Sequence, residues 1–220
     1  MKVLILVILI YLLWIFRPTN KIGYNVIHLL GNDERTNNIN TMEDILGQDI
    51  YRNWAISWIP KDEFRKIRNQ SEKIYNRQEV CCYKSHVKAI DAISTSNSEY
   101  GVIFEDDFSV EDSSHSTIEK LVDEFPNFDI LFIGSQNPEY KGDHVSGNVF
   151  KVEQENFVPG AHAYIIKKES AKKILDSLKE INKPIDVKFH EQIINGNLNG
   201  YIVHPSIVGL SNLKSTLDHN

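Results

Sequence analysis

Short apolar runs alternate along the chain with polar stretches, and this alternation predicts the secondary structure. Apolar runs of strand length occupy residues 24–30, 51–59, 100–104, 129–133, 157–166 and 201–203. Helices are expected at residues 33–46, 61–77, from Ser85 past Ile93, 118–125, 171–178 and after Pro184. In the clearest of these, apolar residues recur every three to four positions, as on one helix face. Such alternation is typical of an α/β domain with a mixed, mostly parallel sheet flanked by helices.

Local signals mark several of the expected boundaries. Asp33 and Glu34 supply the negative charge that a helix start favours, and Gly47 is a typical residue just past a helix end. Pro60 stops the second expected strand, and Pro159-Gly160 interrupts the strand expected at 157–166. The chain therefore divides into short elements of ordinary globular length.

The amino terminus differs from the rest of the chain. Fourteen apolar residues run from Val3 to Phe16 between Lys2 and Arg17. A helix of this stretch is about 22 Å long, short of a ~30 Å hydrocarbon core. A cleavage site needs small residues at alternate positions, and residues 16–20 do not supply them. An uncleaved single-pass membrane anchor is therefore favoured over a cleaved signal or a buried helix, with its side of the membrane undetermined. The expected division is an anchor or signal at 1–17, a linker at 18–23 and one domain at 24–220.

Composition and charge narrow the class of protein. With 24 basic and 30 acidic side chains, the net charge is -6, which argues against nucleic acid as a partner. Aromatic residues make up 10% of the chain, enough for a folded core. The two cysteines, Cys81 and Cys82, are adjacent and close no long loop, so we expect small buried hydrophobic residues rather than a disulfide framework.

An acidic triplet follows the strand expected at 100–104, where open α/β sheets bind ligands. Alternation along an extended chain places Glu105 and Asp107 on one side and Asp106 on the other. Carboxylates about 4 Å apart repel by roughly 4 kcal/mol at an effective dielectric constant of about 20, so the triplet favours a shared cation or proton. A pair with this spacing can hold a divalent ion beside a diphosphate. The alternative is a solvated acidic turn.

Six ordered motifs between about residues 24 and 210 resemble glycosyltransferase family 25. Val26 to Leu29 and Arg35 match a strand ending I-N-L with arginine six residues later, and Gln78 to His86 match G-E-I-G-C-x-x-S-H. The remaining matches are a strand leading into L-E-D-D at 102–107, D-I-L-x-x-G at 129–134, G-x-x-A-Y-I-I at 160–166 and P-I-D at 184–186. His28 replaces an asparagine of the family motif, and Gln78 and Cys81 replace glycines.

The resemblance implies an enzyme with a GT-A-like fold. The expected reaction moves a hexose, galactose or glucose, from a nucleotide donor such as a UDP-hexose to a hydroxyl of a glycan, glycolipid or protein, with inversion and with Mn2+. Asp107 and Glu105 are the expected metal ligands, and Asp186 is the expected catalytic base. The expected donor-binding residues are Leu29, Arg35, Ser85, His86, Asp106, Gly160 and His162.

Several of these residues have structural alternatives. Arg35 could contact the diphosphate or nucleotide, or form a surface ion pair with Asp33 or Glu34. Ser85 is expected to cap a helix that it opens together with His86, whose ring makes either a buried structural hydrogen bond or a donor contact. Asp186 could instead cap the helix that begins at Val187.

Two other functions compete with glycosyl transfer. A sugar- or nucleotide-binding protein that has lost turnover is suggested by the replaced glycines, because glycine lets backbone approach a ligand closely. A metal-dependent phosphoryl-transfer enzyme could use the acidic triplet, but the sequence contains no phosphate-cradling glycine loop and no second acidic cluster.

Overall fold

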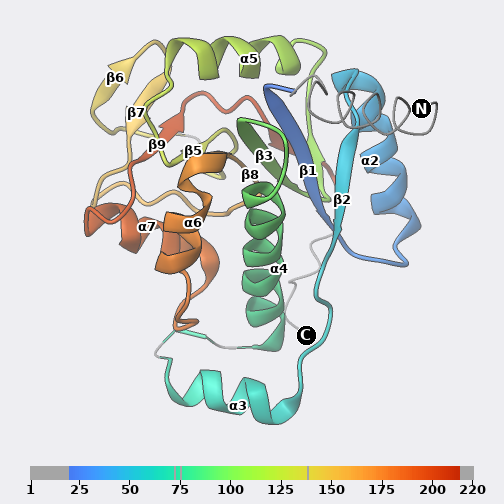
Figure 1. Cartoon of the computed structure of the whole chain (residues 1–220), viewed down its shortest axis with the longest axis vertical. Coiled ribbons are helices and arrows are strands. Elements are labelled where there is room, and N and C mark those ends of the chain that lie inside the picture. Colours follow the sequence, from blue (N-terminus) through green and yellow to red (C-terminus); the bar gives the residue numbers. More distant parts are fainter. Residues whose placement is uncertain (1–19, 72, 75, 138, 214–220) are drawn as a thin grey trace, which may run out of the picture.

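The computed structural model describes residues 20–71, 73–74, 76–137 and 139–213 (Figure 1). The anchor or signal predicted at residues 1–17 lies outside the described residues. Within the described ranges, no helix combines the length and the apolar character that a membrane crossing needs.

The described residues form a mixed sheet of eight strands in the order β2-β1-β3-β8-β5-β9-β7-β6. Their bounds are β1 Ile22–His28, β2 Ile50–Trp54, β3 Tyr100–Glu105, β5 Ile130–Phe132, β6 His144–Ser146, β7 Val149–Lys151, β8 Ala163–Lys167 and β9 Gly200–Val203. Strand β1 pairs in parallel with β2 and β3, and β5 with β9, whereas β8 and β7 run antiparallel to their neighbours. The predicted mixed, mostly parallel sheet is confirmed.

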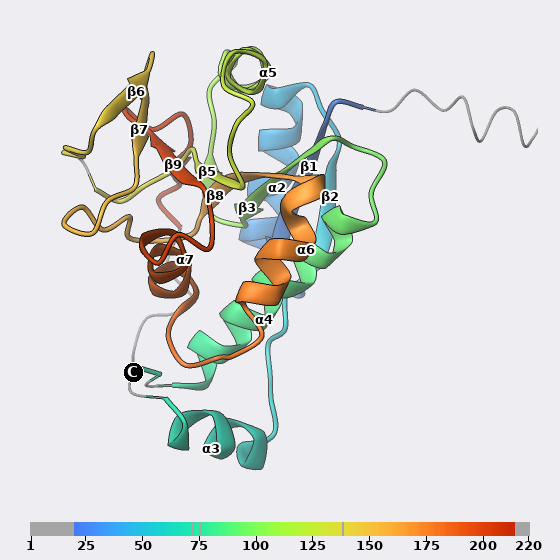
Figure 2. The same ribbon diagram turned by 60° about the vertical axis from the view of Figure 1, so that its left-hand side comes forward.

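Helices cover both faces of this sheet (Figures 1 and 2). Their bounds are α2 Asp33–Leu46, α3 Lys61–Asn69, α4 Arg77–Ser94, α5 Ser114–Glu124, α6 Lys168–Ser177 and α7 Ile185–Ile194. Apolar residues of α2 and α5 pack on one face, and those of α4, α6 and α7 pack on the other. Helix α3 lies away from the sheet, beyond the N-terminal end of α4.

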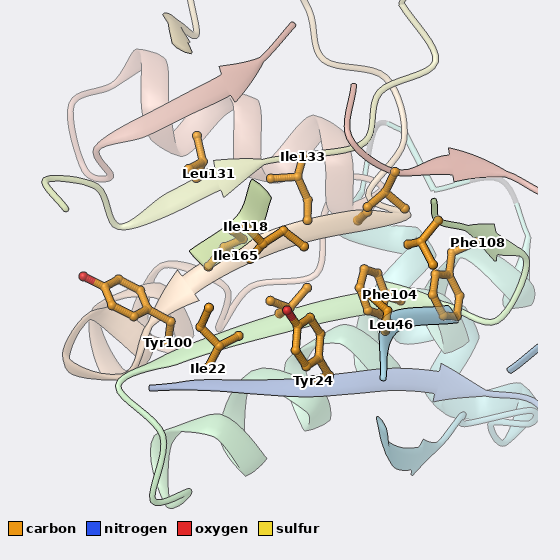
Figure 3. Packing of buried hydrophobic residues seen from close by; sticks show 14 of the residues in the cluster. Ile22, Tyr24, Leu46, Tyr100, Phe104, Phe108, Ile118, Leu131, Ile133 and Ile165 are labelled. Atoms are coloured by element: carbon orange, nitrogen blue, oxygen red, sulfur yellow. The ribbon is translucent and has the colours of Figure 1, made fainter. Parts of the chain in front are cut away.

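The core on the α2 and α5 face reaches the end of β3. Tyr24, Phe104 and Ile165 lie on three neighbouring strands of this cluster (Figure 3). Phe104 and Phe108 stack with ring centroids 4.2 Å apart and nearly parallel planes. The three residues between them are Glu105, Asp106 and Asp107, so the acidic triplet is held at both ends by the core. Phe108 begins β4 (Phe108–Ser109), which pairs with β10 (Gly209–Leu210).

Two helix boundaries show what the local sequence controls. Helix α2 matches the prediction, with the Asn32 side chain accepting the Arg35 backbone N–H and Gly47 ending the helix at φ 62°. Helix α4 begins at Arg77, so the predicted start at Ser85 is wrong. The reason is a capping box: the Asn76 side chain accepts the Glu79 N–H, and the Glu79 side chain accepts the Asn76 N–H.

Two predicted strands are shorter in the structure. Strand β2 ends at Trp54. The Ala55 N–H still donates to the His28 carbonyl of β1, whereas the Ile56 N–H donates to the Ser85 hydroxyl instead of to the sheet. Strand β8 begins only at Ala163, after the Pro159-Gly160 interruption. The hairpin of β6 and β7 was not predicted, since its three-residue strands carry no readable apolar pattern.

Candidate active site

A cleft of about 290 Å3 opens where β1 and β3 end, beside the first half of α4. It is lined by Ile27, Leu29, Arg35, Ala55, Ile56, Ser57, Gln78, Cys81, Cys82, Ser85, His86, Glu105, Asp106 and Asp107. A larger hollow, about 600 Å3, lies along the far edge of the sheet between residues 151–155 and 193–201. The smaller cleft is the candidate active site, because it alone of these two brings three carboxylates, a histidine and two thiols together.

Asp106 joins the ends of β1 and β3. One carboxylate oxygen, Oδ2, accepts the Leu29 N–H at 2.8 Å and contacts His28 Nδ1 at 3.3 Å. The other, Oδ1, accepts a hydrogen bond from the guanidinium of Arg35. Asp106 is only 4% exposed. The structure therefore places Asp106 at the cleft with both oxygens already engaged by protein, and Leu29 enters the site through its backbone N–H as well as its place in the lining.

Arg35 is buried between two of the three carboxylates. Its guanidinium donates to Asp106 Oδ1 and, at 3.2 Å, to Asp107 Oδ2. The alternative of a surface ion pair between Arg35 and Asp33 or Glu34 is wrong, since Arg35 is only 3% exposed. These two carboxylates raise the pKa of Arg35 although burial opposes the charge. The positive charge of Arg35 thus balances the negative charges of Asp106 and Asp107 at the cleft.

Asp107 keeps one oxygen without a partner. Its Oδ2 contacts Arg35, whereas Oδ1 is buried and has no hydrogen-bond partner within the described part of the chain. Burial raises the pKa of Asp107, and the neighbouring charge of Glu105 raises it further, against the opposing effect of Arg35. A buried carboxylate oxygen with no donor costs free energy until a cation or proton reaches it.

Glu105 points toward α4. Its Oε1 lies 3.2 Å from His86 Nε2, and His86 Nδ1 lies 2.9 Å from the Tyr164 hydroxyl. Burial opposes the charge of Glu105, but the hydrogen bond to His86 and the nearby positive groups prevail and lower the pKa of Glu105. The structural alternative for His86 is confirmed, because its ring is fully buried and hydrogen-bonded. The residue also lines the cleft, so a donor contact stays a prediction.

Ser85 does not cap a helix. It lies in the middle of α4, where its hydroxyl donates to the Cys81 carbonyl at 2.7 Å and accepts the Ile56 N–H at 2.8 Å. The capping role expected for Ser85 is wrong, because α4 begins eight residues earlier. Ser85 instead fixes the segment after β2 as a wall of the cleft.

The two cysteines have different surroundings. Cys81 is buried in a small apolar cluster with Ile59, Ile74 and Val80, as expected for a small hydrophobic residue. Cys82 is half-buried and lines the cleft. Burial raises the pKa of the Cys82 thiol well above its usual range, and the charge of Glu105 adds to the effect. Cys82, His86 and Glu105 bring a sulfur, a ring nitrogen and a carboxylate oxygen within 4.8 Å of one another.

His162 lies opposite Glu105, because the Glu105 N–H donates to the His162 carbonyl at 2.8 Å. Its ring is buried, and Nδ1 has no hydrogen-bond partner among the residues described. Burial lowers the pKa of His162 although the charge of Glu105 opposes this. Gly160 adopts φ 81°, and a Cβ there would lie 3.4 Å from His162 Nδ1. Glycine at 160 therefore leaves space beside the unpartnered nitrogen.

Asp186 supports the turn that carries Gly160. One carboxylate oxygen accepts the Gly160 N–H at 3.1 Å, and the other accepts the Val187 N–H at 2.8 Å. It occupies the first turn of α7, which begins at Ile185, and it is absent from the lining of the 290 Å3 cleft. Each oxygen retains a further acceptor position.

Parts of the site were not predicted from the sequence. The wall formed by Ala55, Ile56 and Ser57 was expected to be strand, and Cys82 was expected to be an inert hydrophobic residue. The segment of β10 also reaches the site, because the Ser211 N–H donates to the Asp107 carbonyl at 2.6 Å. Only Cys82 had a readable signal, since it stands one helical turn before His86.

Comparisons with known proteins show the family and the fold of the chain. A family model described as glycosyltransferase family 25, LPS biosynthesis protein, matches residues 59–189. The fold resembles a structure of S. aureus TarS in complex with UDP-GlcNAc, at 11% identity and a TM-score of 0.51, over 91% of this chain and 62% of that one. It also resembles a glycosyltransferase involved in glycosylation of the major capsid of PBCV-1, at 11% identity and a TM-score of 0.52, over 88% and 94% of the two chains. No curated protein matches the sequence.

Replacing Arg35 tests the ion pairs beneath the cleft. We expect Arg35→Ala to lower the free energy of unfolding by about 3–5 kcal/mol, because it leaves Asp106 buried without its cation. The matched control is Arg52→Ala, which breaks a more exposed pair with Glu43 and should cost no more than about 1 kcal/mol. Urea unfolding followed by circular dichroism measures both. Equal losses in the two variants would contradict the assignment of Arg35.

Proposed function

The chain belongs to glycosyltransferase family 25, and we propose that it transfers a hexose, galactose or glucose, from a UDP-hexose to a hydroxyl of a glycan, glycolipid or protein, with inversion and with a divalent cation. The observation that carries the proposal is the cleft at the ends of β1 and β3. Asp107 lines this cleft, and its buried Oδ1 has no hydrogen-bond partner among the described residues. UDP is the proposed nucleotide because the S. aureus structure that shares this fold contains UDP-GlcNAc.

Asp107 and Glu105 fit a hard divalent cation. Carboxylate oxygens suit Mn2+ or Mg2+, and the buried Oδ1 of Asp107 is an acceptor without a hydrogen-bond partner in the part of the chain that the structure describes. When bound, Mn2+ would neutralise the negative charge that develops on the departing diphosphate. Asp107 is the first ligand in this proposal. Glu105 is the second, although His86 already holds one of its oxygens.

The other charged residues of the cleft act on Asp107 rather than replace it. Arg35 donates to Asp107 Oδ2, so Oδ1 is the oxygen that we propose for the cation. Asp106 holds Arg35 and the Leu29 backbone through hydrogen bonds. The remaining acceptor positions of its oxygens could accept a hydrogen bond from a hydroxyl of the nucleotide sugar. A contact between Arg35 and the diphosphate would require the guanidinium to share its hydrogen bonds with Asp106 and Asp107. Arg35 therefore supports the donor site mainly through the two carboxylates.

We place the hexose of the donor between the acidic turn and the segment from Gly160 to His162. The His162 Nδ1 can accept a hydrogen bond from a sugar hydroxyl. Burial lowers the pKa of His162 and so favours the neutral ring, and Nδ1 has no hydrogen-bond partner within the described residues. Gly160 leaves space at this nitrogen. His86 and Ser85 shape the opposite wall through Glu105 and Ile56.

Asp186 is the proposed catalytic base. Inversion requires a group on the side opposite the leaving diphosphate to take the acceptor proton as the new bond forms. The backbone N–H groups of Gly160 and Val187, which donate to the two oxygens of Asp186, hold its carboxylate in one orientation. The oxygens keep acceptor positions for the incoming hydroxyl.

A binding protein without turnover is the second candidate. Gln78 and Cys81, which stand where the family motif has glycines, both line the cleft. Their side chains occupy volume that glycine would leave to a ligand. Saturable donor binding with no release of UDP would favour this candidate.

Attachment to a membrane through residues 3–16 belongs to the same proposal. An anchor at the amino terminus would keep the domain near lipid-linked acceptors. Separation of the full chain into membrane and soluble fractions examines this point independently of catalysis.

Asp107→Asn tests the metal and donor site. We expect UDP release from UDP-galactose or UDP-glucose with Mn2+ to fall by about 100-fold or more, because the substitution removes a charge that balances the cation. The amide introduced by this substitution retains an oxygen for Arg35, so folding should survive. The control is Asp112→Asn at an exposed position, which should retain the wild-type rate. A wild-type rate in the Asp107 variant would rule out the proposed ligand.

Asp186→Asn tests the base. Transfer should fall by about 10²–10⁴-fold, because the amide cannot take the acceptor proton. The affinity for UDP in the presence of Mn2+, measured by calorimetry, should stay within about twofold of the wild-type value. If affinity and transfer fall together, or the variant unfolds, Asp186 only supports the Gly160 turn.

A further inference from the structure

Cys82, His86 and Glu105 form a second group of ligand atoms in the cleft, which shares Glu105 with the hard oxygen site proposed at Asp107. Their sulfur, ring nitrogen and carboxylate oxygen all lie within 4.8 Å of one another. We propose that these three residues bind a thiophilic divalent cation, Zn2+, at the wall of the cleft formed by α4. The site needs only the folded chain, whereas its effect on catalysis, described below, rests on the proposed function.

The secondary structure brings the three ligands together. Cys82 and His86 stand four residues apart on α4, so their side chains project from one face a single turn apart. Glu105 ends β3, and its Oε1 lies 3.2 Å from His86 Nε2. All three side chains line the same cleft, from which a cation can enter.

Tyr164 fixes the histidine for metal binding. The Tyr164 hydroxyl lies 2.9 Å from His86 Nδ1 at a fully buried position. When Nδ1 carries the proton and donates it to this hydroxyl, Nε2 presents its lone pair toward Cys82 and Glu105. A metal-binding histidine usually has such a partner on its other ring nitrogen, which sets the tautomer and the direction of the ring.

The spacing suits a small tetrahedral ion. With bonds of about 2.0 Å to nitrogen and oxygen, two ligands of a tetrahedral zinc lie about 3.3 Å apart. The separation of His86 Nε2 and Glu105 Oε1, 3.2 Å, is close to that value. The Cys82 sulfur needs to approach by about 1 Å, which rotation of a half-buried side chain can supply. Because the three residues line the cleft, water could supply a fourth ligand from it.

The donor set selects the cation. A thiolate and an imidazole prefer Zn2+, whereas carboxylates alone suit Mn2+ or Mg2+. The cleft would therefore contain two sites of different preference that share Glu105. Zinc held by Cys82 and His86 would draw Glu105 away from Asp107 and occupy volume needed by the diphosphate. Zinc is thus expected to oppose donor binding rather than to assist transfer.

Cobalt spectroscopy of the full-length chain tests the site. Co2+ is added to the reduced, metal-free protein, and absorption from thiolate-to-cobalt charge transfer is followed in the near ultraviolet. We expect the band to saturate at one equivalent and to disappear when Zn2+ is added. In Cys82→Ser the band should be absent, while the matched variant Cys81→Ser should retain it, because the Cys81 sulfur is not part of the group.

A second variant tests the geometry without touching a ligand. Tyr164→Phe removes the hydroxyl that orients His86 and should weaken zinc binding by about 10–100-fold while leaving the cobalt band in place at saturation. Thermal unfolding of each variant shows that the domain is folded. The proposal is overturned if the wild-type chain gives no thiolate band, or if the band depends on Cys81 instead of Cys82. Neither result bears on transfer supported by Asp107.

Discussion

The buried contact of Asp106 with Arg35 is the interaction on which the site depends. Asp106 ties the start of α2, through Arg35, and the end of β1, through the Leu29 N–H, to the end of β3. Asn38 of α2 adds hydrogen bonds to the carbonyls of Asp106 and Phe108. Breaking a buried ion pair by removing one partner costs about 3–5 kcal/mol, so this turn is strongly held.

That constraint gives three adjacent acids three different roles. Asp106 faces the protein, where its oxygens are engaged. Asp107 shares Arg35 through one oxygen and keeps the other without a partner in the described structure. Glu105 contacts His86 across the cleft. Because the stacked rings of Phe104 and Phe108 hold both ends of the triplet, these roles cannot be exchanged by a small rotation of the backbone.

Much of the fold could be predicted from local chemistry. The bounds of α2 follow from Asn32, Asp33 and Gly47, and the end of β3 follows from the change from apolar to acidic residues. Helix α4 was placed too late because only its second half has a clear apolar period. The capping residues Asn76 and Glu79 in its polar first half were not used.

The site was predictable in its residue types but not in their partners. The acidic triplet and His86 line one cleft at the ends of β1 and β3, and His162 lies beside Glu105. The burial of Arg35 depends on long-range contacts over 71 positions of sequence, for which no local pattern exists. The same holds for Ser85, whose hydroxyl fixes a segment 29 residues away. Local rules describe which groups are present, whereas tertiary packing decides which of them keep an acceptor for a ligand.

Anomalous X-ray scattering from crystals of the protein grown with Mn2+ and UDP would locate the cation and the diphosphate. We expect a manganese peak within bonding distance of Asp107 Oδ1, with the diphosphate in the cleft between Glu105 and α4. A manganese ion bound away from Asp107, with UDP ordered outside this cleft, would show that the acidic turn is not the metal site.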